Sequence, residues 1–433
     1  MSMSTTTVST TATDTTMSAG AGIARIALPE GFLPFDGFGT TGADQPLFAR
    51  AVAFEDARGG RLVVLSIEAT SLREPLLSDL RRDAAQAAGT GLDRVWVCVT
   101  HSFSIPHVRT DAHVHDSREL MLNGQWRTSI RSAARGVVEA ACANLRPATL
   151  LFGQTTCQAN VSRDVETPEG WWLGKGGQVG QGFSDHTVRV LEARDAAGRT
   201  IALLTSYDVQ SSVMDGVRDE AGLKVVSPDM AGLACQAVER TLAGDAPVAG
   251  QLDLPPVCLF VVGAAGDQMP LVGAGAGADA LVPAARSLEL AIVRAREGAR
   301  ALAPAAIKTC GLDLELPGQV MPANMRDLRP TRSYERVSAA PHPTHVQLAS
   351  VAGVPLVGLA PEVSSLMGSR IRELAGAPRA LVLTMVNGAA KYLVEAEAYD
   401  RDTYESMNSG FARGAGETLV ASVAERLRTM TSI

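Results

Sequence analysis

Several polar side chains follow directly after apolar, β-rich runs of the sequence. They are Glu68, His101, Asp208, Asp267, Glu362 and Asn387. In open α/β sheets ligands bind beyond the carboxyl ends of the strands, so these residues are the first candidates for one common site. An imidazole surrounded by carboxylates can exchange protons with a substrate or hold a divalent cation. The pattern therefore predicts acid–base or metal-assisted chemistry.

Each candidate also has an ordinary structural explanation. His101, in VTHSFSIP, either reaches a metal from the loop after a buried strand or is a hydrogen-bonded core histidine. Glu362, in LAPEVSS, is either a ligand or an acid at the start of a helix. His113 and His115 have the H-x-H spacing of metallohydrolases, but no apolar strand precedes them, which favours a solvated loop. Ordinary loop packing is likewise favoured for the C-terminal tyrosines Tyr392, Tyr399 and Tyr404.

The signatures of several large enzyme classes are missing from the sequence. GAGAGA at 273–278 approaches a dinucleotide-binding pattern, but only two apolar residues precede it where that fold needs a full strand. There is no G-x-S-x-G elbow, no Walker A loop and no H-E-x-x-H pair. The sequence therefore gives no motif support for a serine hydrolase, an NTPase or a zincin.

Hydrophobic periodicity places the candidate residues on alternating strands and helices. Strands are predicted at 61–67, 94–101, within 187–208 as a hairpin, within 255–270, on both sides of 352–353, and at 380–388. Helices are predicted after residue 72, at 117–145 with Gly124 as a candidate interruption, and at 280–303, 364–374 and 415–430. Residues 170–182 form a Gly- and Trp-rich loop of the kind that covers a site. This order predicts an α/β fold with a mixed β-sheet core and flanking helices.

Composition restricts the partners and the compartment. The net charge of −7, with no basic patch, argues against nucleic acid and against an anionic membrane, and favours a small-molecule substrate. The 6 cysteines are scattered and form no C-x-x-C pair, so we expect buried thiols in a reducing compartment. The Ala- and Gly-rich helices permit a homo-oligomer but equally describe interior helices.

The first 20 residues, MSMSTTTVSTTATDTTMSAG, have neither the basic nor the apolar region of a secretory signal, and no membrane anchor. We therefore expect a disordered Thr/Ser-rich tail over 1–20, one large domain over 21–433, no integral membrane association and a cytoplasmic location.

A further set of motifs follows in a fixed order from about Ala21 to the end of the chain. They are AGIARIALPEG, QPLFARAVAF, VVLSIEAT, VTHSFSIP, NVSRDVETP, TSYDVQSS, SPDMAG, GAAGDQMP, LAPE and NGAAKYLVEAEAYDRDTYE. Each motif is loose, but in this order they resemble the N-terminal catalytic domain of the neutral/alkaline, non-lysosomal ceramidase family. The resemblance implies a ceramidase-like fold with one zinc ion that activates water against an amide. It implies His101, Glu362 and Tyr392 as metal ligands and Arg163 as the active-site arginine.

Two positions depart from the family pattern. VTHSFSIP corresponds to T-H-T-H-S-G-P, so Phe103 replaces a histidine that contacts the substrate. TSYDVQSS corresponds to N-Y-A-V-H-P-T, so Gln210 replaces a zinc-binding histidine. Neutral glutamine is a poor zinc ligand, and the loss of one imidazole predicts weaker binding and makes ceramide itself a doubtful substrate.

Other residues could replace the missing histidine ligand and form a different metal site. Asp208 can supply an oxygen, and Glu68 and Asp229 would complete an oxygen-rich pocket that suits Zn²⁺, or the harder ions Mg²⁺ and Mn²⁺. His107 replaces a small residue just after the first loop. The residues expected to bind substrate are Phe103, His107, Gln210, Asp229 and Asn387.

These observations lead to three hypotheses. The first is a metal-dependent hydrolase of an amide or related C–N bond in a small soluble metabolite, with His101, Arg163, Asp208 and Glu68 as catalytic residues. The cation would lower the pKa of water toward about 7, and Arg163 would stabilise the developing oxyanion. The second is a metal-independent acid–base enzyme such as an isomerase, lyase or cyclase, and the third is a degenerate, non-catalytic binding protein.

Overall fold

A nine-stranded mixed sheet forms the centre of the computed structural model, which describes residues 16–42, 45–111, 114, 116–174, 178–244 and 255–431. Its strand order is β13-β11-β10-β6-β1-β3-β4-β5, and β15 pairs with β6. The pairs β4–β5 and β11–β13 are parallel and the others antiparallel, which confirms the predicted mixed sheet. The strands are β1 (Met17–Ile26), β3 (Leu47–Glu55), β4 (Arg61–Ile67), β5 (Val95–Val99), β6 (Arg146–Thr156), β10 (Thr187–Arg194), β11 (Thr200–Tyr207), β13 (Val257–Val262) and β15 (Arg300–Ala301).

Four long helices cover one face of this sheet. They are α1 (Leu76–Ala88), α2 (Ser117–Ala143), α3 (Asp229–Ala243) and α4 (Ala278–Glu297). Two apolar clusters join them to alternate residues of the strands, as the twofold periodicity of a strand requires. Helix α2 continues through Gly124, which therefore does not interrupt it.

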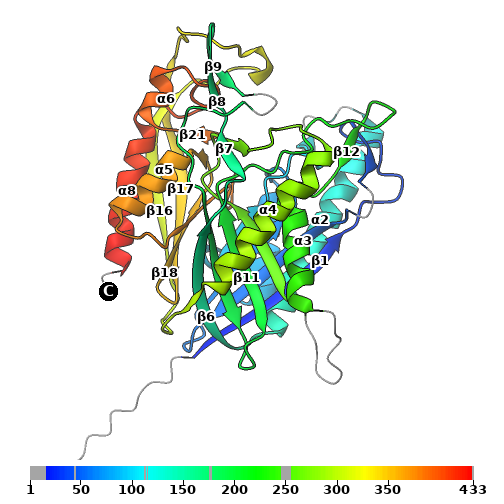
Figure 1. The fold of residues 1–433 in the computed structure, drawn as a ribbon, viewed down its shortest axis with the longest axis vertical. Coiled ribbons are helices and arrows are strands. Elements are labelled where there is room, and N and C mark those ends of the chain that lie inside the picture. The colour runs from blue at the N-terminus through cyan, green and yellow to red at the C-terminus, as the bar shows by residue number, and fades with distance from the viewer. Residues whose placement is uncertain are drawn as a thin grey trace, which may run out of the picture.

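A second sheet packs on the other face, so the molecule has four layers: helices, sheet, sheet and helices (Figure 1). The second sheet has the order β16-β17-β18-β20, from β16 (Lys308–Gln319), β17 (Ser338–Val351), β18 (Val354–Leu359) and β20 (Leu381–Thr384). Val64 and Trp96 of the first sheet share one buried cluster with Val351 and Leu383 of the second. Helices α5 (Ser365–Leu374) and α8 (Ala415–Thr431) cover the outer face of the second sheet.

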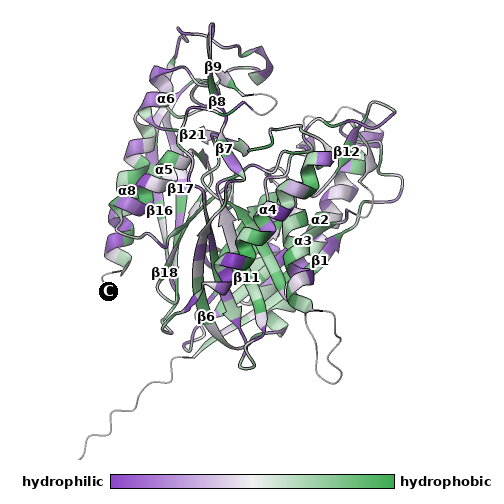
Figure 2. Cartoon of the chain, in the orientation of Figure 1, coloured by the Kyte–Doolittle hydropathy of each residue, from purple (hydrophilic) through white to green (hydrophobic). Residues whose placement is uncertain are grey.

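The colours of Figure 2 follow these layers, with apolar residues along the strands and a polar outer side on the helices. The sequence predicted neither β16 nor α3. Charged and apolar residues alternate along Lys308–Gln319, as in a strand with one exposed face. Helix α3 was not predicted because the SPDMAG sequence at its start is typical of a turn.

The start of the ordered chain was placed too late. Strand β1 begins at Met17 and pairs with both β3 and β6, so Met17 to Gly20 belong to the sheet and not to a tail. The main-chain hydrogen bonds of the sheet outweigh the low apolar content of these residues. Residues 1–15 lie outside the described part of the chain.

The 6 cysteines are all free; Cys98, Cys157, Cys235 and Cys258 are buried, whereas Cys142 and Cys310 are partly exposed. Within the described residues, none of the helices combines the length and the apolar character that a membrane crossing needs.

Short strand pairs gather at one end of the sandwich, where β7, β8, β9 and β21 are labelled in Figure 1. The pairs are β7 (Asn160–Ser162) with β14 (Gln268–Pro270), β8 (Asp164–Thr167) with β9 (Gly170–Leu173), and β19 (Glu362–Val363) with β21 (Tyr392–Leu393). The short helices α6 (Ala396–Asp400) and α7 (Tyr404–Met407) follow β21. A further pair, β2 (Phe38–Thr41) with β12 (Lys224–Val226), lies on the side of α2 and α3. The pairs around β7 and β21 carry the polar residues of the site described next.

Candidate functional site

His101 is held in a fixed orientation just beyond strand β5. Its backbone has the left-handed φ of 55°, a conformation that non-glycine residues adopt mostly where the surroundings enforce it. Its side chain is buried, with Nδ1 2.7 Å from the carbonyl oxygen of Thr70 and Nε2 3.0 Å from Oε2 of Glu362. Because a carbonyl oxygen only accepts hydrogen bonds, Nδ1 is assigned the proton.

This assignment leaves Nε2 facing a carboxylate oxygen. If Nε2 carried no proton, two lone pairs would meet at 3.0 Å, so a positive charge must lie between them. That charge is either a second proton on the imidazole or a cation that both groups hold. Burial acts to raise the pKa of Glu362, but the neighbouring His101, with Arg163 and Lys391, outweighs it and lowers that pKa, so Glu362 is ionised at neutral pH.

Glu362 is positioned by backbone pairing across the short strands. Glu362 pairs in parallel with Tyr392, and its backbone amide donates to the carbonyl of Lys391 at 2.8 Å. The loop after β13 passes directly beside it, because a Cβ on Gly266 would lie only 2.6 Å from the Glu362 carbonyl oxygen. Glycine is therefore required at 266 for this close approach.

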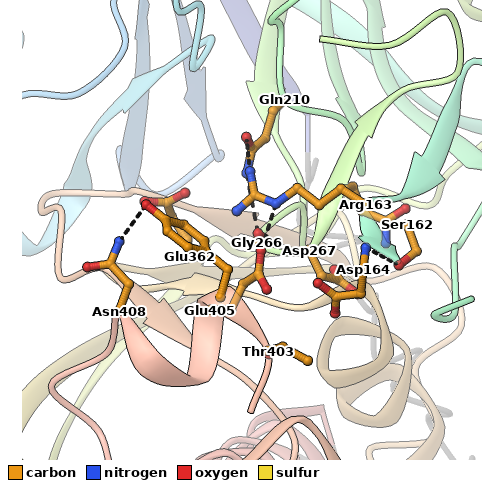
Figure 3. Close-up of polar contacts among 12 residues, drawn as sticks. Ser162, Arg163, Asp164, Gln210, Gly266, Asp267, Glu362, Thr403, Glu405 and Asn408 are labelled. Atoms are coloured by element: carbon orange, nitrogen blue, oxygen red, sulfur yellow. Dashed lines mark hydrogen bonds and ion pairs between the residues drawn. The ribbon is translucent and has the colours of Figure 1, made fainter. Parts of the chain in front are cut away.

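Arg163 lies in the same buried region, with its guanidinium between Gln210 and Glu405 (Figure 3). Its Nε donates to Oε1 of Glu405 at 2.7 Å, and its Nη1 donates to Oε1 of Gln210 at 2.8 Å. The guanidinium carbon is 5.3 Å from the centre of the Tyr392 ring. Among the described residues, Nη2 of Arg163 has no hydrogen-bond partner although it is buried. A buried donor without a partner is costly, so this N–H is available to a ligand.

A group of carboxyls surrounds Arg163. Oδ1 of Asp164 and Oε2 of Glu405 are both buried and have no donor among the other described side chains, but a proton on one of the two carboxyls lets them hydrogen-bond to each other. Burial, and next the neighbouring Glu405, raise the pKa of Asp164 well above its usual range. Burial, followed by the charge of Glu395, raises the pKa of Asp267 to about 8. The raised pKa favours the protonated form of Asp164, and Glu405 forms the ion pair with Arg163.

The two departures from the family pattern both lie beside this centre. The ring of Phe103 packs edge-on against His101, with 4.7 Å between the ring centres. Gln210 uses its oxygen for Arg163 and its amide nitrogen for the carbonyl of Ala265 at 3.0 Å. Both ends of the Gln210 side chain are thus hydrogen-bonded within the described residues.

Two of the predicted catalytic residues are committed to other contacts. Glu68 is fully buried and accepts from Nη1 of Arg50 at 2.6 Å and from the amide of Phe48 at 2.8 Å. Asp208 accepts from the amide of Ala264 at 2.9 Å and from the hydroxyl of Ser365 at 3.0 Å. Neither carboxylate forms a hydrogen bond with His101 in the described part of the chain. Of the six residues expected at one common site, His101 and Glu362 are in side-chain contact, and Asp267 lies among the carboxyls beside Arg163.

Three predicted substrate ligands also have structural partners. Asp229 accepts from the amides of residues 213, 214 and 230 and so fixes the start of helix α3. Asn387 exchanges hydrogen bonds with the backbone of β5, taking the place of a strand neighbour. His107 lies at the surface, where it pairs with Asp36 at 2.9 Å. His113 and His115 lie outside the described residues.

The sequence analysis missed Glu405, Asp164 and Thr70. Glu405 contacts Arg163 across 242 positions of the sequence and Thr70 contacts His101 across 31, whereas Asp164 directly follows Arg163 and interacts with Glu405. The only signal near Glu405 is DTYE, where Thr403 caps the short helix α7.

His101, Glu362 and Tyr392 are the candidate ligands for a zinc ion. Within the described ranges no three His, Cys, Asp or Glu side chains are grouped as a metal site requires. His101 and Glu362 supply an imidazole and a carboxylate, and Tyr392, paired with Glu362 in the backbone, is the third candidate. Burial, and then the charge of Glu362, raise the pKa of the Tyr392 phenol, so its ionisation would depend on a cation. With this phenol the set meets the three protein ligands of a catalytic zinc site, and without it the set falls short.

Comparisons with known proteins support the fold. No family model matches the sequence, and no curated protein matches it. The solved structure of neutral ceramidase from Pseudomonas aeruginosa is similar with a TM-score of 0.72 and 17% identity, over 97% of this chain and 75% of that one. A ceramidase structure complexed with C2 gives a TM-score of 0.73 and 17% identity, over 96% and 76% of the two chains. From its first described strand to its last helix, this chain has the fold of the neutral ceramidases.

Proposed function

We propose that this protein is a hydrolase of an amide or related C–N bond in a small metabolite, and that His101 and Glu362 share a divalent cation at its reactive centre. The observation that carries the proposal is the pair of facing acceptors, Nε2 of His101 and Oε2 of Glu362, 3.0 Å apart. Metal-binding histidines usually donate their other ring N–H to a carbonyl or carboxylate that fixes the ring, as Nδ1 of His101 does to Thr70. The likeness in fold to two ceramidases supports hydrolysis as the reaction class.

His101, Glu362 and Tyr392 would hold the cation, with Zn²⁺ favoured over Mg²⁺ or Mn²⁺ because one ligand is an imidazole. Such a cation supplies a Lewis acid, which polarises a carbonyl and acidifies water toward a pKa of about 7.

Arg163 would bind the substrate carbonyl and stabilise its negative charge as the reaction proceeds. Its Nη2 is a buried donor with no partner among the described residues, while Glu405 and Gln210 hold the other guanidinium nitrogens in place. A donor that is fixed before the reaction starts needs no reorganisation when charge develops. Phe103 provides an apolar wall beside His101, in a position where a histidine would have offered a hydrogen bond.

A second candidate is a metal-independent acid–base enzyme on the same site. It is favoured by Gln210, whose oxygen accepts from Arg163 and whose nitrogen donates to Ala265, because a hydrogen-bonded amide stands where the resemblance implies a zinc-binding imidazole. In that case the positive charge between the two acceptors is a proton, and His101 as an imidazolium acts as the general acid with Glu362 as its partner.

Metal analysis of the freshly purified protein, followed by assay on a panel of small amides with and without a chelator, distinguishes the metal-dependent hydrolase from the acid–base enzyme. The metal-dependent proposal predicts about one bound cation per chain, activity lost on chelation, and loss of both in His101→Ala. His345→Ala is the matched control, since His345 is exposed and pairs only with Asp313 in the described residues. Activity that survives chelation and depends on His101 would support the acid–base enzyme. Inactivity across the panel with no bound metal would contradict both and favour a binding protein.

A further inference from the structure

A polar pocket of about 420 Å³ lies between strand β10 and helix α5. Its lining includes Asp185, Arg189, Arg372 and Glu373. None of these residues contacts Arg163 or the His101–Glu362 pair in the described structure, so the pocket is separate from the site proposed above.

Two arginines in this pocket depend on one carboxylate oxygen. Nη2 of Arg372 lies 2.6 Å from Oδ2 of Asp185, and Nη1 of Arg189 lies 3.0 Å from the same atom. Both arginines are buried, with exposed fractions of 6% and 8%. Nη1 of Arg189 also reaches the carbonyl of Thr187 at 3.4 Å, but its Nε is buried and has no partner among the described residues.

The charges in the pocket do not balance. Two guanidinium groups face the single carboxylate of Asp185. Asp208, the next carboxyl toward the interior, already accepts from Ser365 and Ala264, and burial raises its pKa to about 7, so it is partly protonated at neutral pH. Glu373 lies at the exposed rim and forms no ion pair with either arginine in the described residues. Burial and the charge of Arg189 both lower the pKa of Arg372, as expected for cations that lack full compensation.

We propose that this pocket is a binding site for a small oxyanion, with phosphate or a phosphate monoester as the ligand class. A tetrahedral oxyanion accepts several hydrogen bonds at once, and the planar guanidinium group matches its geometry. The ligand would accept from Nε of Arg189 and from the guanidinium of Arg372. It would add negative charge beside two guanidinium groups that Asp185 and the partly protonated Asp208 compensate only in part.

The test is calorimetric titration of the full chain with inorganic phosphate, with sodium chloride at equal ionic strength as the reference. Arg372→Gln should weaken phosphate binding at least tenfold, because it removes one cation and its donors. Arg413→Gln is the matched control: Arg413 pairs with Asp400 at the surface, with both side chains more than half exposed, and its loss should leave the affinity unchanged.

A second variant keeps the proposal testable if Arg372→Gln does not fold. Arg189→Lys keeps the charge but removes the unpaired Nε, and should weaken phosphate binding several-fold. Parallel titration with a phosphate monoester shows whether the pocket takes the free ion or an esterified phosphate, and either result supports the proposal. Native protein that binds phosphate no better than chloride, or an unchanged phosphate affinity in both pocket variants, would overturn it.

Discussion

Nε2 of His101 lies 3.0 Å from Oε2 of Glu362, although 261 positions separate the two residues in the sequence. His101 follows a strand of the first sheet, and Glu362 follows a strand of the second. The contact therefore depends on the face-to-face packing of the two sheets. Because Nδ1 of His101 is committed to Thr70, the contact also requires a positive charge between the two side chains.

Gln210→His is expected to strengthen cation binding at least tenfold. It adds an imidazole beside the centre, at the position where the resemblance to ceramidases implies a zinc ligand, and zinc prefers nitrogen donors to a neutral amide. The change is measured by competition with a chromophoric chelator.

Gln210→Leu serves as the control, because it removes the hydrogen bonds to Arg163 and Ala265 without adding a ligand. If the histidine and leucine variants bind the cation equally well, the side chain at 210 does not face the cation and this expectation is wrong.

Arg163→Met should lower the free energy of unfolding by about 3–5 kcal/mol, because it leaves the carboxylate of Glu405 buried without its partner. The exposed fractions of the two side chains are 10% and 0%, so solvent cannot replace the lost charge. Urea unfolding at constant pH measures the effect.

The exposed pair of Arg413 and Asp400 gives the comparison, and Arg413→Met should cost less than about 1 kcal/mol. Equal losses in the two variants would mean that Arg163 does not stabilise Glu405 as described.

The sequence predicted much of the fold because hydrophobic periodicity is local. The strand at 61–67 and the helix that starts at Ser117 agree with the structure. It did not predict that the strands divide into two sheets, because the separation of β13 from β20 depends on which apolar faces meet.

The candidate site was predictable in part for the same reason. The motifs that contain His101 and Glu362 resemble those of the ceramidase family, which predicted that the two residues share one site. The structure brings their side chains into contact. Glu68 was expected at the same site, yet its partner Arg50 lies on the neighbouring strand of the first sheet. A one-dimensional pattern shows that a polar residue follows a strand, but not which buried charge will compensate it.

Stability should fall as the pH rises from about 4 to about 7, and Asp208 should contribute to this fall. Burial raises its pKa from 3.8 to about 7 in the folded chain. Between these values the folded protein holds a proton that the unfolded chain has released, so unfolding becomes easier as the pH rises through this window. At about 1.4 kcal/mol for each pKa unit, the contribution of Asp208 is at most roughly 4 kcal/mol.

Asp208→Asn keeps an acceptor for Ala264 and removes the titration. Its unfolding free energy should therefore decline less between about pH 4 and about pH 7 than that of the native chain. The same decline in both proteins would show that Asp208 does not titrate in this range.

Titration of Zn²⁺ into metal-free protein, with the native chain compared with Glu362→Gln, tests whether a cation lies between His101 and Glu362. One equivalent of zinc is expected to bind to the native protein, with an affinity at least tenfold weaker in the variant, since an anionic ligand becomes a neutral one. No uptake by the native protein, or the same affinity in both, would show that the charge between His101 and Glu362 is not a metal ion.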